Sequence, residues 1–141
     1  MSREANVAVV RRSFDHFADA DMEAWTAAWT DDIVFDASAY APWTEEPKTY
    51  RGTVEILEFF GRMMAGVRVL TVDLHEVSAV DDDRVIALYT ERRQEAGGEP
   101  YPLEVGIVYT LRDGRLSRVQ VHSDFAAARR TAARPGASSP G

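Results

Sequence analysis

A polar strip near the end of the chain carries an acid and a base at strand spacing. Residues 114–125 read GRLSRVQVHSDF, in which His122 and Asp124 are two positions apart and Gln120 and Arg118 continue the row. Positions two apart in a β-strand share one face of the sheet. The strip is therefore either an acid–base site or the solvent-facing side of a sheet.

Several common catalytic and cofactor signatures are absent from the sequence. The chain has no cysteine, which excludes disulfides, thiolate catalysis and cysteine-based zinc sites. Its three histidines, His16, His75 and His122, lack metal-ligand spacing such as HxH or HxxxH. The glycine pair at 97–98 has no helix after it, so it predicts a hairpin turn instead of a phosphate loop. We expect a protein that works without a metal or an organic cofactor.

Length, composition and charge narrow the class further. A chain of 141 residues suits one domain that is large enough to bury a core, and 45% hydrophobic with 28% charged residues is ordinary for such a domain. No apolar run approaches the length of a membrane span, and charges interrupt the N-terminal segment, so we expect a cytoplasmic protein without a signal peptide. The net charge of −7 disfavours nucleic acid as a partner.

The periodicity of apolar residues changes half-way along the chain. Helical spacing over residues 7–17, 21–29 and 53–66 predicts three helices. A short strand is expected at residues 31–35, and most of residues 37–52 is expected to be a loop.

The second half contains four β-branched, nearly alternating runs, at residues 67–80, 84–94, 103–112 and 115–125. Asp113-Gly114 is a strong signal for a tight hairpin between the last two.

Three helices followed by a meander of long strands predict an α+β fold. The helices would pack on one face of a strongly curved antiparallel sheet. We expect one domain over residues 1–130. Residues 131–141 are mostly small, polar or Pro/Gly-rich and are expected to form a disordered tail.

Three segments, taken in order, resemble a known family: FDHFADADMEAWTAAWTDDIVF, YRGTVEILEFF and VYTLRDGRLSRVQVHSDFAAA. The chain is similar over roughly residues 7–130 to the SnoaL-like branch of the nuclear transport factor 2-like superfamily. This resemblance implies a cone-shaped α+β barrel with a deep pocket. Members include polyketide cyclases, ketosteroid isomerases, limonene epoxide hydrolases, dehydratases and non-catalytic binding domains, so the fold alone does not decide the function.

The resemblance does not carry over either of two known catalytic sets. At the ketosteroid isomerase positions the base is replaced by Ala37, the tyrosine by Ser13 and the second acid by Val108. Asp36 is one residue from the base position, and a bulge could turn it inward. Of the limonene epoxide hydrolase set only the arginine remains, at Arg92.

The resemblance also implies which row of each strand faces the pocket. On the last strand the inward row would be Val119, Val121 and Ser123, which places His122 and Asp124 on the opposite row, at the surface or in an interface. A shift of one residue would exchange the two rows.

Alternation then assigns even-numbered residues of the two preceding strands to the pocket. Together with helix and loop residues, the expected ligand-binding set is Ser13, Phe17, Phe35, Trp43, Phe59, Met63, Leu88, Thr90, Gln94, Val108, Val121 and Ser123.

Arg92 and Glu104 are the charged residues of this expected pocket, and two interpretations remain open for them. In one, Arg92 orients a substrate oxygen while Glu104 transfers a proton, with Asp36 or Tyr40 assisting. In the other, the two form an exposed salt bridge of little consequence.

Two functional hypotheses follow. The first is a cofactor-independent enzyme that performs cyclisation, isomerisation, dehydration or epoxide opening on an apolar polyketide- or terpenoid-like metabolite. The alternative is a non-catalytic small-molecule-binding or dimerisation module of the same fold. The resemblance also implies a homodimer formed through an outer sheet face that would carry Tyr89, Glu91, Gln120 and His122.

Overall fold

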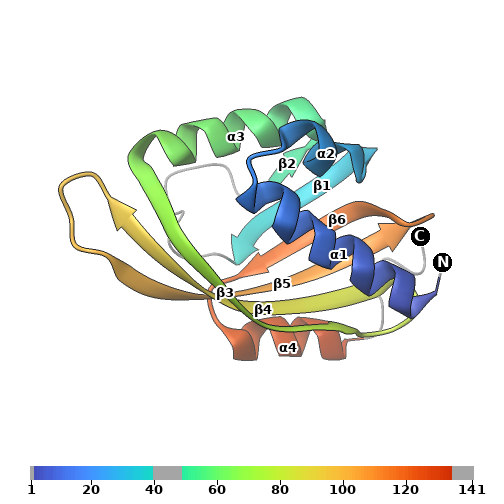
Figure 1. Ribbon diagram of the computed structural model, residues 1–141. Coiled ribbons are helices and arrows are strands. Elements are labelled where there is room, and N and C mark those ends of the chain that lie inside the picture. Colours follow the sequence, from blue (N-terminus) through green and yellow to red (C-terminus); the bar gives the residue numbers. More distant parts are fainter. Residues whose placement is uncertain (1, 40–48, 135–141) are drawn as a thin grey trace.

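The computed structural model of the protein describes residues 2–39 and 49–134. In this part of the chain six strands form one curled, unclosed sheet, with three helices over its inner face and a fourth helix beneath its outer face (Figure 1). The predicted α+β class is confirmed. No helix among the described residues is long and apolar enough to cross a membrane.

Three of the four helices among the described residues begin at a side-chain cap. Ser2 accepts a hydrogen bond from the backbone N–H of Ala5, and Asp21 accepts one from Ala24, which satisfies N–H groups that the first turns leave without partners. The helices are α1 (Arg3–Ala18), α2 (Met22–Ala27), α3 (Gly52–Gly66) and α4 (Phe125–Ala133).

The sheet has the strand order β2-β1-β6-β5-β4-β3. Its strands are β1 (Trp29–Ala39), β2 (Thr49–Arg51), β3 (Val67–Ala79), β4 (Arg84–Glu95), β5 (Tyr101–Arg112) and β6 (Arg115–His122). β1 runs parallel to β6, and every other neighbouring pair is antiparallel. The predicted hairpin at Asp113-Gly114 is confirmed, and both residues have the positive φ that such a tight turn requires.

Three features differ from the expectations. β1 extends to Ala39, well beyond the predicted short strand, and β2 forms inside the predicted loop. β2 is held by pairing with β1 and by its Tyr50, whose ring stacks on Phe59 of α3 at 4.3 Å. The third difference is α4, which begins at Phe125 and crosses the expected domain boundary at residue 130.

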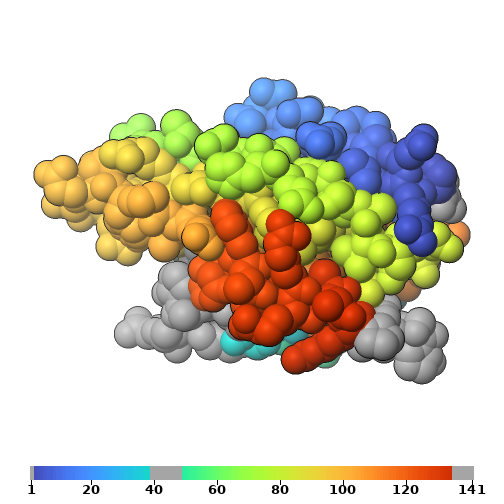
Figure 2. Space-filling model, turned by 90° about the horizontal axis from the view of Figure 1, so that it is seen from below, coloured from blue at the N-terminus to red at the C-terminus, as the bar shows by residue number. Residues whose placement is uncertain are grey.

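Apolar side chains fill two separate layers. The larger core lies between α1–α3 and the inner face of the sheet. A smaller cluster lies between the outer face and α4, and it consists of Ile86, Leu88, Val108 and Ala128. Figure 2 shows α4 lying across this outer side of the molecule. β4 and β5 are therefore buried on both faces, whereas a sheet with one solvated face would show clean alternation.

Candidate active site

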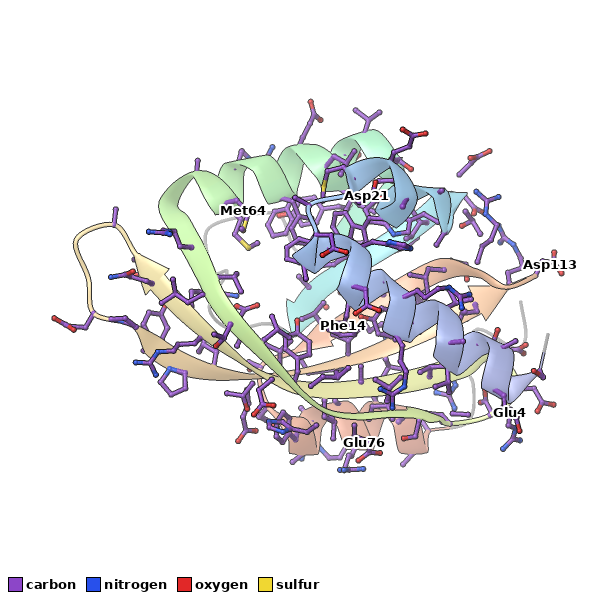
Figure 3. The ribbon with its side chains drawn as sticks, in the orientation of Figure 1. Glu4, Phe14, Asp21, Met64, Glu76 and Asp113 are labelled. Atoms are coloured by element: carbon purple, nitrogen blue, oxygen red, sulfur yellow. The ribbon has the colours of Figure 1, made fainter. Side chains whose placement is uncertain are left out.

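A cavity of about 110 Å³ lies between α1–α3 and the inner face of the sheet. Figure 3 shows side chains gathered in this space, with Phe14 directed from α1 toward the sheet. The described residues that line the cavity are Ser13, Phe14, Phe17, Trp25, Trp29, Phe35, Phe60, Met63, Val69, Val72, Tyr89, Glu91, Arg93, Val105, Ile107, Tyr109, Leu116, Val119 and Val121.

Aromatic rings form much of the wall. Trp25 of α2 packs edge-on against Trp29 at 4.7 Å and against Phe60 of α3 at 5.3 Å between ring centroids. Phe60 also meets Phe35 of β1 at 5.3 Å. Such edge-to-face contacts stabilise the wall beyond the area that they bury and hold the rings in fixed orientations.

A buried ion pair interrupts this apolar wall. Glu91 and Arg93 are two positions apart on β4, so both project to the inner face, and they are only 7% and 4% exposed. Arg93 Nε donates to Glu91 Oε2 at 2.7 Å, and Arg93 Nη2 donates to the same oxygen. Within the described residues no group donates to the other carboxylate oxygen, Oε1. The pair therefore offers an acceptor oxygen beside a guanidinium group.

Two tyrosines also reach the cavity. Tyr89 precedes Glu91 on the same row and packs edge-on against Phe14, with ring centroids 5.2 Å apart. Tyr109 of β5 is 6% exposed, and burial raises the pKa of its phenol well above the usual range. The Tyr109 hydroxyl is therefore protonated at neutral pH and can donate a hydrogen bond.

The SnoaL-like domain family matches residues 10–119 of the sequence, which is most of the chain. The chain belongs to the SnoaL-like family. No protein among curated sequences is significantly similar to it.

Solved structures support the SnoaL-like assignment at the level of the fold. A nuclear transport factor 2-like protein of unknown function from Burkholderia pseudomallei is 22% identical, with a TM-score of 0.76 over 95% of this chain and 100% of that one. TerC, crystallised with polyporic acid, is 21% identical, with a TM-score of 0.73 over 92% and 99% of the two chains. A candidate polyketide cyclase from Xanthomonas campestris is 21% identical, with a TM-score of 0.70 over 94% and 100%.

The structure brings five residues of the expected ligand-binding set to the cavity of this SnoaL-like domain. They are Ser13, Phe17, Phe35, Met63 and Val121. Phe59 is fully buried in the core against Tyr50, and its neighbour Phe60 lines the cavity instead. Tyr40 and Trp43 lie outside the described residues.

The facing predicted for β4 and β5 is wrong by one residue. Leu88, Thr90, Arg92, Gln94, Glu104 and Val108 all belong to the outer row, and none of them lines the cavity. Leu88 and Val108 are buried against α4. Because that helix covers the outer face, apolar residues occupy both rows, and alternation does not distinguish them. Conversely Tyr89 and Glu91, expected on an outer dimer surface, face the cavity.

The polar residues of the outer row are engaged in structural contacts. Glu104 Oε1 accepts a hydrogen bond from the N–H of Phe125 at 3.1 Å, at the start of α4. Thr90 Oγ1 lies 2.7 Å from His75 Nε2, and Gln94 Nε2 donates to the carbonyl of Gly98 at 2.9 Å. Arg92 is exposed.

Asp36 also lies outside the cavity. It is on the row of β1 opposite to Phe35, and its carboxylate pairs with Arg118 of β6 at 3.2 Å. A second contact, from the N–H of Ser38 at 2.9 Å, holds the same side chain. No bulge turns Asp36 inward, which the sequence had left open.

The polar row of Arg118, Gln120, His122 and Asp124 faces away from the cavity. Val119 and Val121 point inward, as predicted, while Ser123 follows the end of the strand and does not line the cavity. Asp124 is the N-cap of α4 and accepts from Ala127 at 2.7 Å. His122 is buried on the outer side, where desolvation lowers its pKa.

Sequence reasoning did not predict Glu91 and Arg93 as cavity residues, although they flank Arg92, the predicted catalytic arginine. The signal that could have found them is the alternation in YTERR, where tyrosine, glutamate and arginine share a row. Among the described residues no three His, Asp or Glu side chains are grouped so that they could hold a metal ion.

Proposed function

We propose that this protein is a cofactor-independent enzyme that transfers protons on a small, largely apolar polyketide- or terpenoid-like molecule held in the cavity. The observation that carries the proposal is the Glu91–Arg93 pair, the charged pair in a wall formed mainly by apolar and aromatic side chains. A buried ion pair is often no more stable than apolar side chains of the same volume. Its presence there is best explained by chemistry on a ligand.

The two side chains suit proton transfer next to a carbonyl group. Glu91 Oε1 would remove a proton from the carbon beside the carbonyl and return it elsewhere on the same molecule, which conserves atoms and charge. The Arg93 guanidinium would stabilise the oxygen that becomes negative in between. The aromatic wall would orient the molecule and exclude water, which strengthens both interactions.

Cavity volume limits what fits. A cavity of about 150 Å³ lined by apolar residues is known to accept benzene, so about 110 Å³ suits one ring or a short chain. Larger ligands would require side chains such as Met63 to move, which an unbranched thioether does readily. Neighbours of this fold include a candidate isomerase from Bacillus subtilis and candidate polyketide cyclases, and TerC was crystallised with polyporic acid.

Deuterium exchange tests the proposal without knowledge of the natural substrate. Small cyclic and linear ketones are incubated in D₂O with the protein, and exchange beside the carbonyl is followed by NMR. We expect the native protein to accelerate exchange and Glu91→Gln to lose about 100-fold of that acceleration. Glu104→Gln is the matched control, because Glu104 lies on the outer face and caps α4.

Two results would count against the proposal. Equal exchange by the native protein and Glu91→Gln would remove the role assigned to Glu91. Ligand binding that stabilises the fold, with no exchange on any ketone, would favour the non-catalytic binding module.

A further inference from the structure

The cavity carries polar groups at two separated ends. Glu91 and Arg93 lie at one end, and in the β4–β5 ladder Glu91 pairs with Leu103. On β5, Tyr109 lies six residues after Leu103 and on the same row of the strand. Six residues correspond to roughly 20 Å of strand. Both ends line one continuous cavity.

Between these ends β5 and β6 present apolar side chains, and Tyr89 of β4, opposite Val105, is the polar residue of this part of the wall. Val105 and Ile107 of β5 lie between Leu103 and Tyr109, and Val119 and Val121 of β6 pair alongside. Apolar side chains along the strand suit the hydrocarbon part of a ligand, and a volume of about 110 Å³ limits that ligand to a slim chain or a single ring.

The hydroxyl of Tyr109 lacks a partner in the described protein. The residue is 6% exposed and lines the cavity, no hydrogen bond joins its hydroxyl to a described residue, and the hydroxyl oxygen is not among the fully enclosed polar atoms without a partner. Because the side chain lines the cavity, the missing partner is expected from the cavity contents.

We propose that Tyr109 is a binding residue that recognises a second oxygen of the ligand, at the end of the cavity remote from Glu91 and Arg93. The ligand is then an elongated molecule with a carbonyl oxygen at one end, an apolar middle and a hydroxyl or carbonyl oxygen at the other. The identity of the reacting end rests on the proposed function. The position of the second oxygen rests on Tyr109 alone.

Matched ketones test this inference. Linear methyl ketones of six to twelve carbons are compared with the same ketones carrying a terminal hydroxyl, and binding is measured through the fluorescence of Trp25 and Trp29, which line the cavity. At the matching chain length the native protein should prefer the hydroxylated ketone by about tenfold, the value of one hydrogen bond to a buried donor. Tyr109→Phe should abolish this preference and leave affinity for the plain ketone unchanged.

Two controls protect the interpretation. Tyr101→Phe removes a hydroxyl that contacts Glu95 outside the cavity, and it should keep the preference. Terminal methoxy ketones, which only accept hydrogen bonds, should bind as well as the hydroxylated ones if Tyr109 donates. A preference that persists in Tyr109→Phe, or no preference at any chain length in the native protein, would overturn the inference.

The two proposals fail separately in these experiments. A preference that depends on Tyr109 without deuterium exchange on any ketone would leave the inference standing and refute the proposed catalysis. Exchange that depends on Glu91 without a Tyr109-dependent preference would do the reverse.

Discussion

The two faces of β4 use neighbouring arginines in opposite ways. Arg93 points inward, is 4% exposed and binds Glu91 beside the cavity, whereas Arg92 points outward and is exposed. Outer-face charges complete a helix: Glu104 and Asp124 accept from the first N–H groups of α4, and Arg84 donates to carbonyls at its end.

The two faces of the sheet also differ in which polar groups lack a hydrogen-bond partner. On the outer face most polar groups around α4 bind partners within the protein, as Glu76 does with Arg129 at 2.8 Å. His122 is the exception among the described residues, because neither of its ring nitrogens has a partner. On the inner face Glu91 Oε1 and the Tyr109 hydroxyl have no partner among the described residues. Most polar groups of the outer face therefore stabilise the structure, whereas the role proposed for Glu91 and Tyr109 on the inner face is to meet a ligand.

Replacing each arginine by alanine gives the largest expected difference between the faces. Arg93→Ala leaves the Glu91 carboxylate buried without its partner, and we expect a loss of about 3–5 kcal/mol in unfolding free energy. Arg92→Ala removes an exposed side chain and should change stability by less than about 0.5 kcal/mol. Urea denaturation of both variants measures the difference.

A double variant separates stability from chemistry. Glu91→Leu with Arg93→Met replaces the pair by apolar side chains, and we expect stability within about 1 kcal/mol of the native protein, or higher. Deuterium exchange should nevertheless be lost. Equal stability losses in Arg92→Ala and Arg93→Ala would contradict the assignment of the two faces.

Close packing of α4 gives the next largest effect. A Cβ added at Gly106 would lie 2.4 Å from the Cβ of Ala128, so Gly106→Ala should cost about 1–3 kcal/mol. Ala128→Gly removes the clashing atom and should recover part of that loss, although glycine in a helix itself costs about 1 kcal/mol. Thermal unfolding of the single and double variants measures the coupling.

A second glycine variant and a ketone-binding measurement serve as controls for Gly106→Ala. Gly61→Ala adds a methyl group to α3 where nothing lies within 4 Å, and it should be neutral or stabilising. Ketone binding in the cavity should be preserved in Gly106→Ala, because the disturbance lies on the outer face. A Gly106→Ala variant as stable as the native protein would show that α4 does not approach β5 this closely.

How much the sequence could reveal depends on whether one face or both faces of a strand are buried. On β6 the inward Val119 and Val121 alternate with the polar Arg118 and Gln120, and the predicted facing is confirmed. On β4 the four residues 85–88 are all apolar, because α4 covers one side and the main core the other. Both registers satisfy such a run equally well, so alternation alone does not identify the inward row of β4.

The sequence analysis does not predict α4, and this explains why it assigns the wrong face of β4 and β5 to the cavity. The segment FAAARRTAA has good helix formers, but its contacts with the sheet are made largely by small residues such as Ala128 and Ala132. Close approach over Gly106, which the sequence does not reveal, makes these small residues sufficient. When α4 is not predicted, the outer row can be assigned to a pocket, and Arg92 and Glu104 then become the candidate catalytic residues.

A titration of His122 gives the smallest expected effect and tests the outer face alone. Desolvation lowers the pKa of His122. The negative charges of Asp36 and Asp124 oppose this shift, and the positive charges of Arg130 and Arg134 reinforce it. Both ring nitrogens lack a partner among the described residues.

The sign of the effect follows from proton binding. Below the unfolded-state pKa of about 6.5 the unfolded chain binds a proton that the folded protein does not, so stability falls as pH falls through that value. The loss levels off once pH passes below the lowered pKa of the folded state, where both states are protonated.

Urea denaturation of the native protein and His122→Leu between pH 7.5 and 5 measures this difference. The variant lacks the titrating group, so its unfolding free energy should fall less than that of the native protein over this range. Parallel curves would show that His122 is solvated, which would require α4 to lift from the sheet. Tyr109-dependent ketone binding should be the same in both proteins at pH 7.5, because His122 lies outside the cavity.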